Sequence, residues 1–182
     1  MRRIMLDIES LSLKPNAFVL SIGAVEFDVG TASLGREFKV TLHDGWQETR
    51  HKDYDTFTWW VNQALTNPRA GHVFQDAGRV DADEAMDRLT DFVKGADEVW
   101  ANGPQFDCVV LENLADELSI NRLWKYSSVR DLRTILNVAA QLHIDPDFYI
   151  AQKEFVAHSA LDDAKKQAWR AIAVLRALGV AA

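Results

Sequence analysis

The chain has 182 residues, 48% of them hydrophobic and 26% charged, which is the usual composition of a soluble globular protein. Twenty basic residues against 27 acidic ones give a net charge of −7, which argues against a broad basic face that grips long duplexes. The single cysteine, Cys108, excludes an intrachain disulfide, and no run of 18 apolar residues indicates a membrane span. We expect one domain over residues 1–182. A cytoplasmic location is also expected, because two acids interrupt the N-terminal stretch that a signal peptide would keep apolar.

The first part of the chain predicts three strands and a helix. The strands are apolar or alternating segments separated by short, turn-rich connections, which favours an antiparallel meander. They are residues 3–8, 18–28 and 34–42. Residues 43–53 are polar and are expected to form a loop. Residues 55–65, which carry Trp59 and Trp60, predict a helix, whereas residues 66–80 show no clear pattern.

The second part of the chain alternates helices with short strands. Asp81 or Asp83 suits the N-cap of a helix that runs to Lys94, and Pro104 suits the first position of another helix. The other expected elements are a strand at 97–101, a strand and a helix within 126–140, and a helix at about 160–178. This order predicts an α/β fold with a mixed five-stranded sheet. Three antiparallel strands are followed by parallel ones, and helices flank the sheet.

Asp7 and Glu9 stand two residues apart on the first predicted strand. Side chains alternate along a strand, so both carboxylates face one side, opposite Ile4, Leu6 and Ile8. Other acid pairs with this spacing lie in polar stretches and are expected to be loop or cap residues. They are Asp53/Asp55, Asp81/Asp83 and Asp145/Asp147. Only the first pair interrupts a central strand, where unpaired charge is costly, so we interpret it as functional.

A second acid, Asp107, falls in the first turn of the helix that begins at Pro104. Taken alone, Asp107 is explained equally well by its favourable interaction with the helix dipole. Asn102 is likewise explained as a turn residue that bonds its own backbone, and Cys108 as a small core residue.

His158 and Asp163 bracket the start of the last predicted helix. Ser159 suits its N-cap and Asp162 its third position, which is close to a capping box. Residues five apart on one helix point about 140° apart. His158 and Asp163 can therefore converge only if His158 lies in the preceding loop. Taken alone, His158 would be read as a surface loop histidine.

Together these residues predict a metal site. We expect four acids to meet at one end of the sheet, namely Asp7, Glu9, Asp107 and Asp163. Their mutual repulsion would be removed by two divalent cations, and oxygen ligands favour Mg²⁺ or Mn²⁺. Two such ions suit the displacement of a phosphoryl group. A nearby histidine such as His158 suits a general base for the attacking water.

The same elements resemble the three motifs of the DEDDh superfamily of 3′–5′ exonucleases, which have a ribonuclease H-like fold. The matching segments are Asp7-x-Glu9, Asn102…Phe106-Asp107 and His158-x4-Asp163. One departure from the broader superfamily is an extra residue between Asn102 and Phe106, and a small branch of the superfamily shares it. The class that uses tyrosine fits less well, because no tyrosine of this chain has an aspartate four residues later.

The chain is most similar to that small stand-alone branch, which contains bacterial exoribonucleases and phage or prophage exodeoxyribonucleases. The similar stretches span nearly the whole chain: residues 6–10, 21–25, 58–60, 102–107, 129–134 and 157–163. The resemblance implies release of nucleoside 5′-monophosphates from the 3′ end of single-stranded DNA or RNA. It assigns the ions to the four acids, places Glu9 near the attacking water, and makes His158 the general base.

Substrate contacts are expected from Asn102, Phe106, Trp59 and Trp60. Aromatic rings, Phe57 included, suit stacking on unpaired bases, although aromatic residues at this density are more often part of the core. A further group suits contact with the terminal nucleotide or with a second subunit, which leaves a homodimer open, although exposed charges at a helix end explain it equally well. These residues are Arg130, Asp131 and Arg133.

Three alternatives remain open. The enzyme could be strictly specific for RNA or oligoribonucleotides, since nothing in the sequence reports on the 2′ position. The chain could be a catalytically silent nucleic-acid-binding module on the same fold, although such a module need not retain all five residues. An acidic Ca²⁺-binding domain would place its ligands in one contiguous loop rather than from residue 7 to residue 163.

Overall fold

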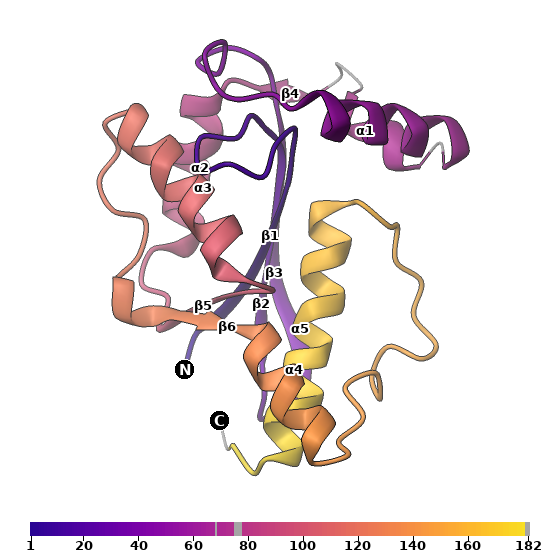
Figure 1. The fold of residues 1–182 in the computed structure, drawn as a ribbon. Helices are drawn as coiled ribbons and strands as arrows, with labels where there is room; N and C mark the ends of the chain where they lie inside the picture. The colour runs from indigo at the N-terminus through magenta and orange to yellow at the C-terminus, as the bar shows by residue number, and fades with distance from the viewer. Residues whose placement is uncertain (68, 75–77, 181–182) are drawn as a thin grey trace.

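One mixed sheet with helices on both faces forms the framework of the computed structural model, which describes residues 1–67, 69–74 and 78–180 (Figure 1). Three long strands form the predicted antiparallel meander: β1 (Arg3–Ser10), β2 (Val19–Asp28) and β3 (Ser33–Leu42). Three short parallel strands extend it: β4 (Arg79–Val80), β5 (Glu98–Ala101) and β6 (Val129–Asp131). The strand order is β4-β3-β2-β1-β5-β6.

The sheet has six strands, one more than the sequence predicted. The additional strand is β4, which pairs with the end of β3. With two residues it is too short to show the alternation by which a strand is recognised. It lies in the stretch 66–80 that gave no pattern and that also holds a short 3₁₀ helix, Ala70–Phe74. Residues 68 and 75–77 of that stretch lie outside the described residues.

The helices confirm the predicted segments to within one or two residues. They are α1 (Tyr54–Thr66), α2 (Ala82–Val93), α3 (Pro104–Glu117), α4 (Leu132–Gln141) and α5 (Ala160–Ala177), with a 3₁₀ turn at Tyr126–Ser128. Asp53 caps α1 by accepting a 2.9 Å hydrogen bond from the Thr56 backbone N–H. Pro104 occupies the first turn of α3, where a missing N–H costs nothing.

The two faces of the sheet carry separate apolar cores. Helices α2 and α3 cover one face, and α4 and α5 cover the other (Figure 1). Ile4, Leu6 and Ile8 of β1 belong to the core under α2 and α3, whereas Met5 belongs to the core under α5. Alternation along β1 therefore directs the next residues of the Met5 side, including Asp7, toward α5.

Helix α1 lies across the end of the sheet where β1 finishes, above the start of α5 (Figure 1). Its Trp60 packs into a small third core with Leu11, Phe18 and Leu20. Among the helices that the structure describes, none combines the length and the apolar character needed to cross a bilayer.

Candidate active site

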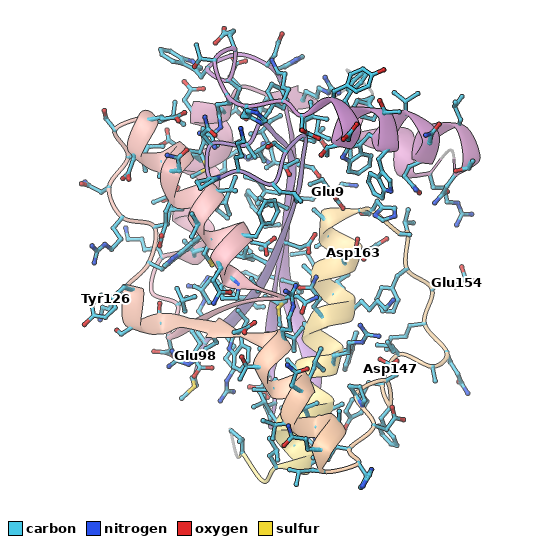
Figure 2. All side chains as sticks on the ribbon, in the orientation of Figure 1. Glu9, Glu98, Tyr126, Asp147, Glu154 and Asp163 are labelled. Atoms are coloured by element: carbon cyan, nitrogen blue, oxygen red, sulfur yellow. The ribbon has the colours of Figure 1, made fainter. Side chains whose placement is uncertain are left out.

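Asp7 and Glu9 project from β1 toward the first two turns of α5, as their spacing predicted. Gln167 of α5 donates a 2.7 Å hydrogen bond from Nε2 to Asp7 Oδ1. Glu9 lies at the end of the strand, close to Asp163 at the start of α5 (Figure 2). Both carboxylates are partly buried, so their charges are held between the sheet and the helix rather than in open solvent.

Asp107 reaches the same place from the other side of β1. Strand β5 pairs with β1 only along Arg3–Met5, so the edge of β1 beyond Met5 has no strand partner on that side. The buried Asp107 carboxylate fills this position by accepting a 3.2 Å hydrogen bond from the Ile8 backbone N–H. The first turn of α3 is thereby fixed against the part of β1 that lies between the two other acids.

Asp163 and His158 complete the group from the start of α5. One ligand atom from each of Glu9, His158 and Asp163 lies within 4.8 Å of the others. His158 precedes the helix and has a φ of 60°, in the left-handed region. This position confirms that the histidine lies in the loop, as its convergence with Asp163 required.

The predicted capping box at this helix start is not formed. Ser159 is the N-cap residue, but its side chain makes no capping hydrogen bond. The Asp162 carboxylate accepts a 2.9 Å hydrogen bond from the Val156 backbone N–H instead. An aspartate is one methylene shorter than the glutamate of a capping box, so it ties down the incoming loop rather than the N-cap.

Gly23 lets the start of α5 lie directly on the sheet. It stands opposite Asp7 in the β1–β2 pairing. An added Cβ would lie 2.2 Å from the Ala160 carbonyl carbon and 2.2 Å from the Leu161 backbone nitrogen. The absent side chain therefore sets the closeness of approach that brings Asp163 to the acids of β1.

Burial and crowding raise the pKa values of these carboxylates. Burial raises the pKa of Asp7 well above its ordinary value, and the charges of Asp107, Glu9 and Asp163 raise it further. Burial, followed by Asp163 and Asp107, raises the pKa of Glu9 to about 8. Burial also raises the pKa of Asp107 to about 6 and that of Asp163 above its ordinary value.

Such a cluster fits divalent cations. Four carboxylates that repel one another take up protons unless positive charge compensates them. Their donor atoms are all oxygens, the ligands that Mg²⁺ and Mn²⁺ favour. His158 adds a nitrogen at the edge of the group.

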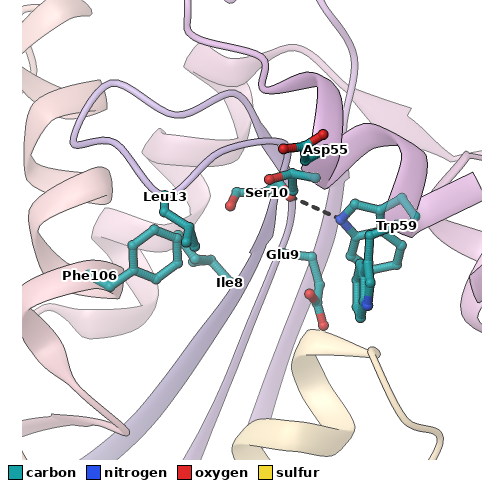
Figure 3. Close-up of a pocket in the computed structure, with 9 residues that line it drawn as sticks. Ile8, Glu9, Ser10, Leu13, Asp55, Trp59 and Phe106 are labelled. Carbon is teal, nitrogen blue, oxygen red and sulfur yellow. Dashed lines mark hydrogen bonds between the residues drawn. The ribbon is translucent and has the colours of Figure 1, made fainter.

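A pocket of about 410 Å³ opens beside Glu9. On one side lie Leu13, Ile8 and Phe106, on the other lies Trp59, and Glu9 points between them (Figure 3). Its full lining is Ile8, Glu9, Ser10, Leu13, Asp55, Thr56, Trp59, Trp60 and Phe106. Glu9 therefore connects the acid cluster to a pocket whose walls are largely apolar.

The expected substrate-contact residues differ in their exposure. Trp59 is 41% exposed and Phe106 lines the pocket. Trp60 is only 1% exposed, and its Nε1 donates a 3.0 Å hydrogen bond to the Ser10 carbonyl, so stacking of this ring on a base does not fit the structure. Asn102 is not among the lining residues; its carbonyl accepts a 2.9 Å hydrogen bond from Arg133 Nη2.

Among the site residues that the sequence did not reveal are Gln167 and Leu13. Gln167 follows Asp163 by four positions on one helix, so it lies on the same face and could have been found by that spacing. Leu13 is 80% exposed on the loop that follows β1. An exposed leucine carries no signal by itself, because apolar atoms make up much of any protein surface.

Asp145, Asp147 and Cys108 lie outside the carboxylate cluster, whereas Asp55, expected to be a loop or cap residue, lines the pocket. Asp145 accepts a hydrogen bond from the Asp147 backbone N–H, and Asp147 pairs with Arg170 at 2.6 Å. Cys108 is a buried core residue, and burial raises the pKa of its thiol.

Comparisons with known proteins identify a matching family and the fold. The model of the 3′-5′ exoribonuclease Rv2179c-like domain matches residues 2–175. A comparison with curated protein sequences finds no match. The nuclease domain of 3′hExo, described as a DEDDh family member bound to rAMP, is 10% identical with a TM-score of 0.66. The alignment covers 100% of this chain and 94% of that one.

Two further solved structures have the same fold. The zinc-bound E. coli ExoI–ssDNA complex is 13% identical with a TM-score of 0.73, and the alignment covers 98% of this chain and 41% of that one. Cell-death related nuclease 4 (CRN-4) is 14% identical with a TM-score of 0.65, covering 98% of this chain and 64% of that one. The chain thus spans less than two thirds of both proteins. At these identities the likeness bears on the ribonuclease H-like fold alone.

Proposed function

Because the chain belongs to the family of 3′-5′ exoribonuclease Rv2179c-like domains, and so to the DEDDh 3′–5′ exonucleases, we propose that it trims single-stranded nucleic acid to nucleoside 5′-monophosphates. The observation that carries this proposal is the meeting of acids from β1, α3 and α5 with a histidine at the end of β1. A silent module on the same fold would have no need of such a costly group of buried acids.

Asp7, Glu9, Asp107 and Asp163 would hold two divalent cations, Mg²⁺ or Mn²⁺. When bound, the cations supply the positive charge that a phosphoryl displacement needs at the attacking and leaving oxygens. The raised pKa values of the acids support this assignment, because burial removes their carboxylates from water and, at Asp7 and Glu9, neighbouring acids add repulsion that bound cations would relieve.

His158 would act as the general base. Its ring nitrogen lies within 4.8 Å of carboxylate oxygens of Glu9 and Asp163, so the three groups could contact the same attacking water molecule. The imidazole takes the proton of that water as it attacks the terminal phosphodiester, and the Glu9 carboxylate accepts a hydrogen bond that orients it. The 3′-hydroxyl of the shortened strand leaves, and the terminal nucleotide departs as a 5′-monophosphate.

The pocket would take the terminal nucleotide. Its volume of about 410 Å³ is in the range of small-molecule sites. A base between Trp59 on one side and Leu13 and Phe106 on the other would be held by stacking and apolar contact, without reading its identity. Asn102 would contact the substrate from the turn before α3, outside the residues that line the pocket. These substrate contacts are part of the proposal.

RNA is the substrate that the family description favours, and DNA is the alternative. The direct test is digestion of matched 5′-labelled single-stranded RNA and DNA with Mg²⁺ or Mn²⁺. We expect a ladder that shortens from the 3′ end, 5′-monophosphates as products, and complete loss of activity with EDTA. Internal cuts from the start of the reaction, or activity in EDTA, would contradict the proposal.

His158→Ala separates chemistry from ion binding. We expect loss of turnover with Mn²⁺ affinity retained, whereas Asp163→Ala should lose both. Metal-dependent turnover that is undiminished in His158→Ala would remove the assigned role. A homodimer and a cytoplasmic location remain predictions, and light scattering of the purified protein would decide the first.

A further inference from the structure

We propose that Trp59 is a positioning residue whose indole ring, anchored through Trp60 to the end of β1, holds the His158 imidazole beside Glu9. This inference rests on the proposed function, because it concerns the orientation of the group assigned as the base. The three rings come from two segments, α1 and the loop before α5, that are about 100 residues apart in the chain.

The three rings form a cluster of edge-to-face contacts. The imidazole centroid of His158 lies 4.8 Å from that of Trp59, with the ring planes at 85°. It lies 6.0 Å from Trp60 at 78°, and the two indoles are 5.1 Å apart at 79°. Edge-to-face packing places the positive edge of one ring on the negative face of another, which favours one orientation over others.

Trp60 ties this cluster to the strand that carries Glu9. Its indole is 1% exposed, and Nε1 donates a 3.0 Å hydrogen bond to the carbonyl of Ser10, the residue after Glu9. The ring also contacts Phe74 edge-on, with centroids 5.8 Å apart. The position of the imidazole relative to the Glu9 carboxylate is thus set through one strand end, by a buried ring that has little freedom to move.

The loop that carries His158 is held at Val156, whose backbone N–H donates to Asp162, but it is exposed on either side of that point. Residues 151–154 and Ala157 are exposed, while Phe155 and Val156 are half-buried. His158 has a φ of 60°, a conformation that costs a non-glycine residue energy and persists only where neighbours enforce it. Contact with Trp59 and Trp60 offers that enforcement from outside the loop.

Variants of Trp59 test the positioning role. Trp59 is 41% exposed, so Trp59→Leu should be tolerated, while Trp59→Phe keeps a ring face. We expect Trp59→Leu to lower kcat on the order of 10- to 100-fold, as misplacement of a catalytic group does, and Trp59→Phe to restore most of it. Leu65→Ala, on an exposed position of the same helix, is the control and should leave kcat unchanged.

A spectroscopic measurement makes the test independent of activity. The Hε1 resonance of His158 should be displaced by the ring currents of the indoles and should move toward the value of an unstructured peptide in Trp59→Leu. An unchanged resonance, or a rise in KM with kcat unchanged, would overturn the positioning role. Failure of the exonuclease assignment would instead appear as an inactive wild type with the resonance still displaced, so the two failures are distinguishable.

Discussion

At the scale of single residues, the pKa of each acid in the site is set by its burial and by its neighbours. Asp7 has one neutral partner, the Gln167 amide, and three acidic neighbours that raise its pKa. Sequence spacing alone predicted that Asp7 and Glu9 share a face, because alternation on a strand is rigid. It did not predict the Asp107 contact with the Ile8 N–H, which depends on where β5 stops pairing with β1.

The raised pKa of Glu9 predicts a pH-dependent stability for the metal-free protein. Its folded pKa of about 8 lies above the ordinary value of 4.5, so between these pH values the folded state binds more protons than the unfolded state. The free energy of unfolding should therefore fall as pH rises from about 5 to about 8.5. Glu9→Gln should lessen this fall and stabilise the metal-free protein at the higher pH.

Urea denaturation in EDTA at the two pH values measures this effect. Glu48→Gln, in the loop before α1 and outside the cluster, is a matched control that should behave as wild type. A Glu9→Gln variant with the same pH dependence as wild type would show that Glu9 does not hold the proton.

Gln167 is predicted to support ion binding through Asp7. Its Nε2 lies 2.7 Å from Asp7 Oδ1 and the side chain is buried, so Gln167→Leu would free the carboxylate to rotate. Loss of a group that orients a metal ligand typically costs 10- to 100-fold in affinity. We expect a loss on the order of 10-fold or more in Mn²⁺ affinity by calorimetric titration. Gln141→Leu, at the exposed end of α4, should show none, and equal affinities for the two variants would refute the supporting role.

At the scale of elements, the sequence predicted the starts of the helices well. It predicted less well which face of each helix is buried. Pro104 predicted the start of α3 correctly. Trp59 and Trp60 were both expected to contact substrate, yet adjacent residues on a helix point about 100° apart. Both rings line the pocket, but Trp60 is buried in the core at 1% exposure, whereas Trp59 is 41% exposed. The choice between them depends on where α1 docks, which the local pattern does not contain.

The docking of α5 on β2 predicts the effect of Gly23→Ala. The new Cβ would lie 2.2 Å from backbone atoms of Ala160 and Leu161, and backbone cannot rotate away as a side chain can. The start of α5 must shift, carrying Asp163 away from the acids of β1. We expect a loss of about 1–3 kcal/mol in the free energy of unfolding, together with loss of Mn²⁺ binding.

Gly35→Ala is the control for this prediction, since its Cβ would meet mainly the Glu26 side chain, at 3.2 Å or more. That variant should keep ion binding whatever its stability. Retention of wild-type Mn²⁺ affinity in Gly23→Ala would mean that the approach of α5 does not set the geometry of the acids.

At the scale of the whole molecule, the net charge indicates that the protein contacts only a few nucleotides of its substrate. The mixed sheet with flanking helices was predicted from the order of elements along the chain, apart from the two-residue strand β4. The order of the strands within the sheet was not predicted, because a local pattern does not show which strands pair. The net charge of −7 was read directly from composition. Long-range phosphate contacts need an excess of basic groups, so an acidic chain must hold its substrate mainly at the terminal nucleotide and through the bound ions.

The small number of expected phosphate contacts predicts a weak dependence of KM on monovalent salt. For single strands the slope of log affinity against log salt is roughly −0.7 for each phosphate that the protein neutralises. With one pocket of about 410 Å³ beside the acids, we expect about one or two such phosphates. KM should then change only a few-fold between 50 and 200 mM KCl at fixed Mg²⁺, where a protein with 6–10 phosphate contacts loses about 10³–10⁵ in affinity.

KM should also be nearly the same for 4- and 20-nucleotide strands, because the protein would not contact the additional phosphates. A steep slope together with a strong length dependence would reveal a basic track, and light scattering on the same sample would then show whether a second copy of the chain completes it.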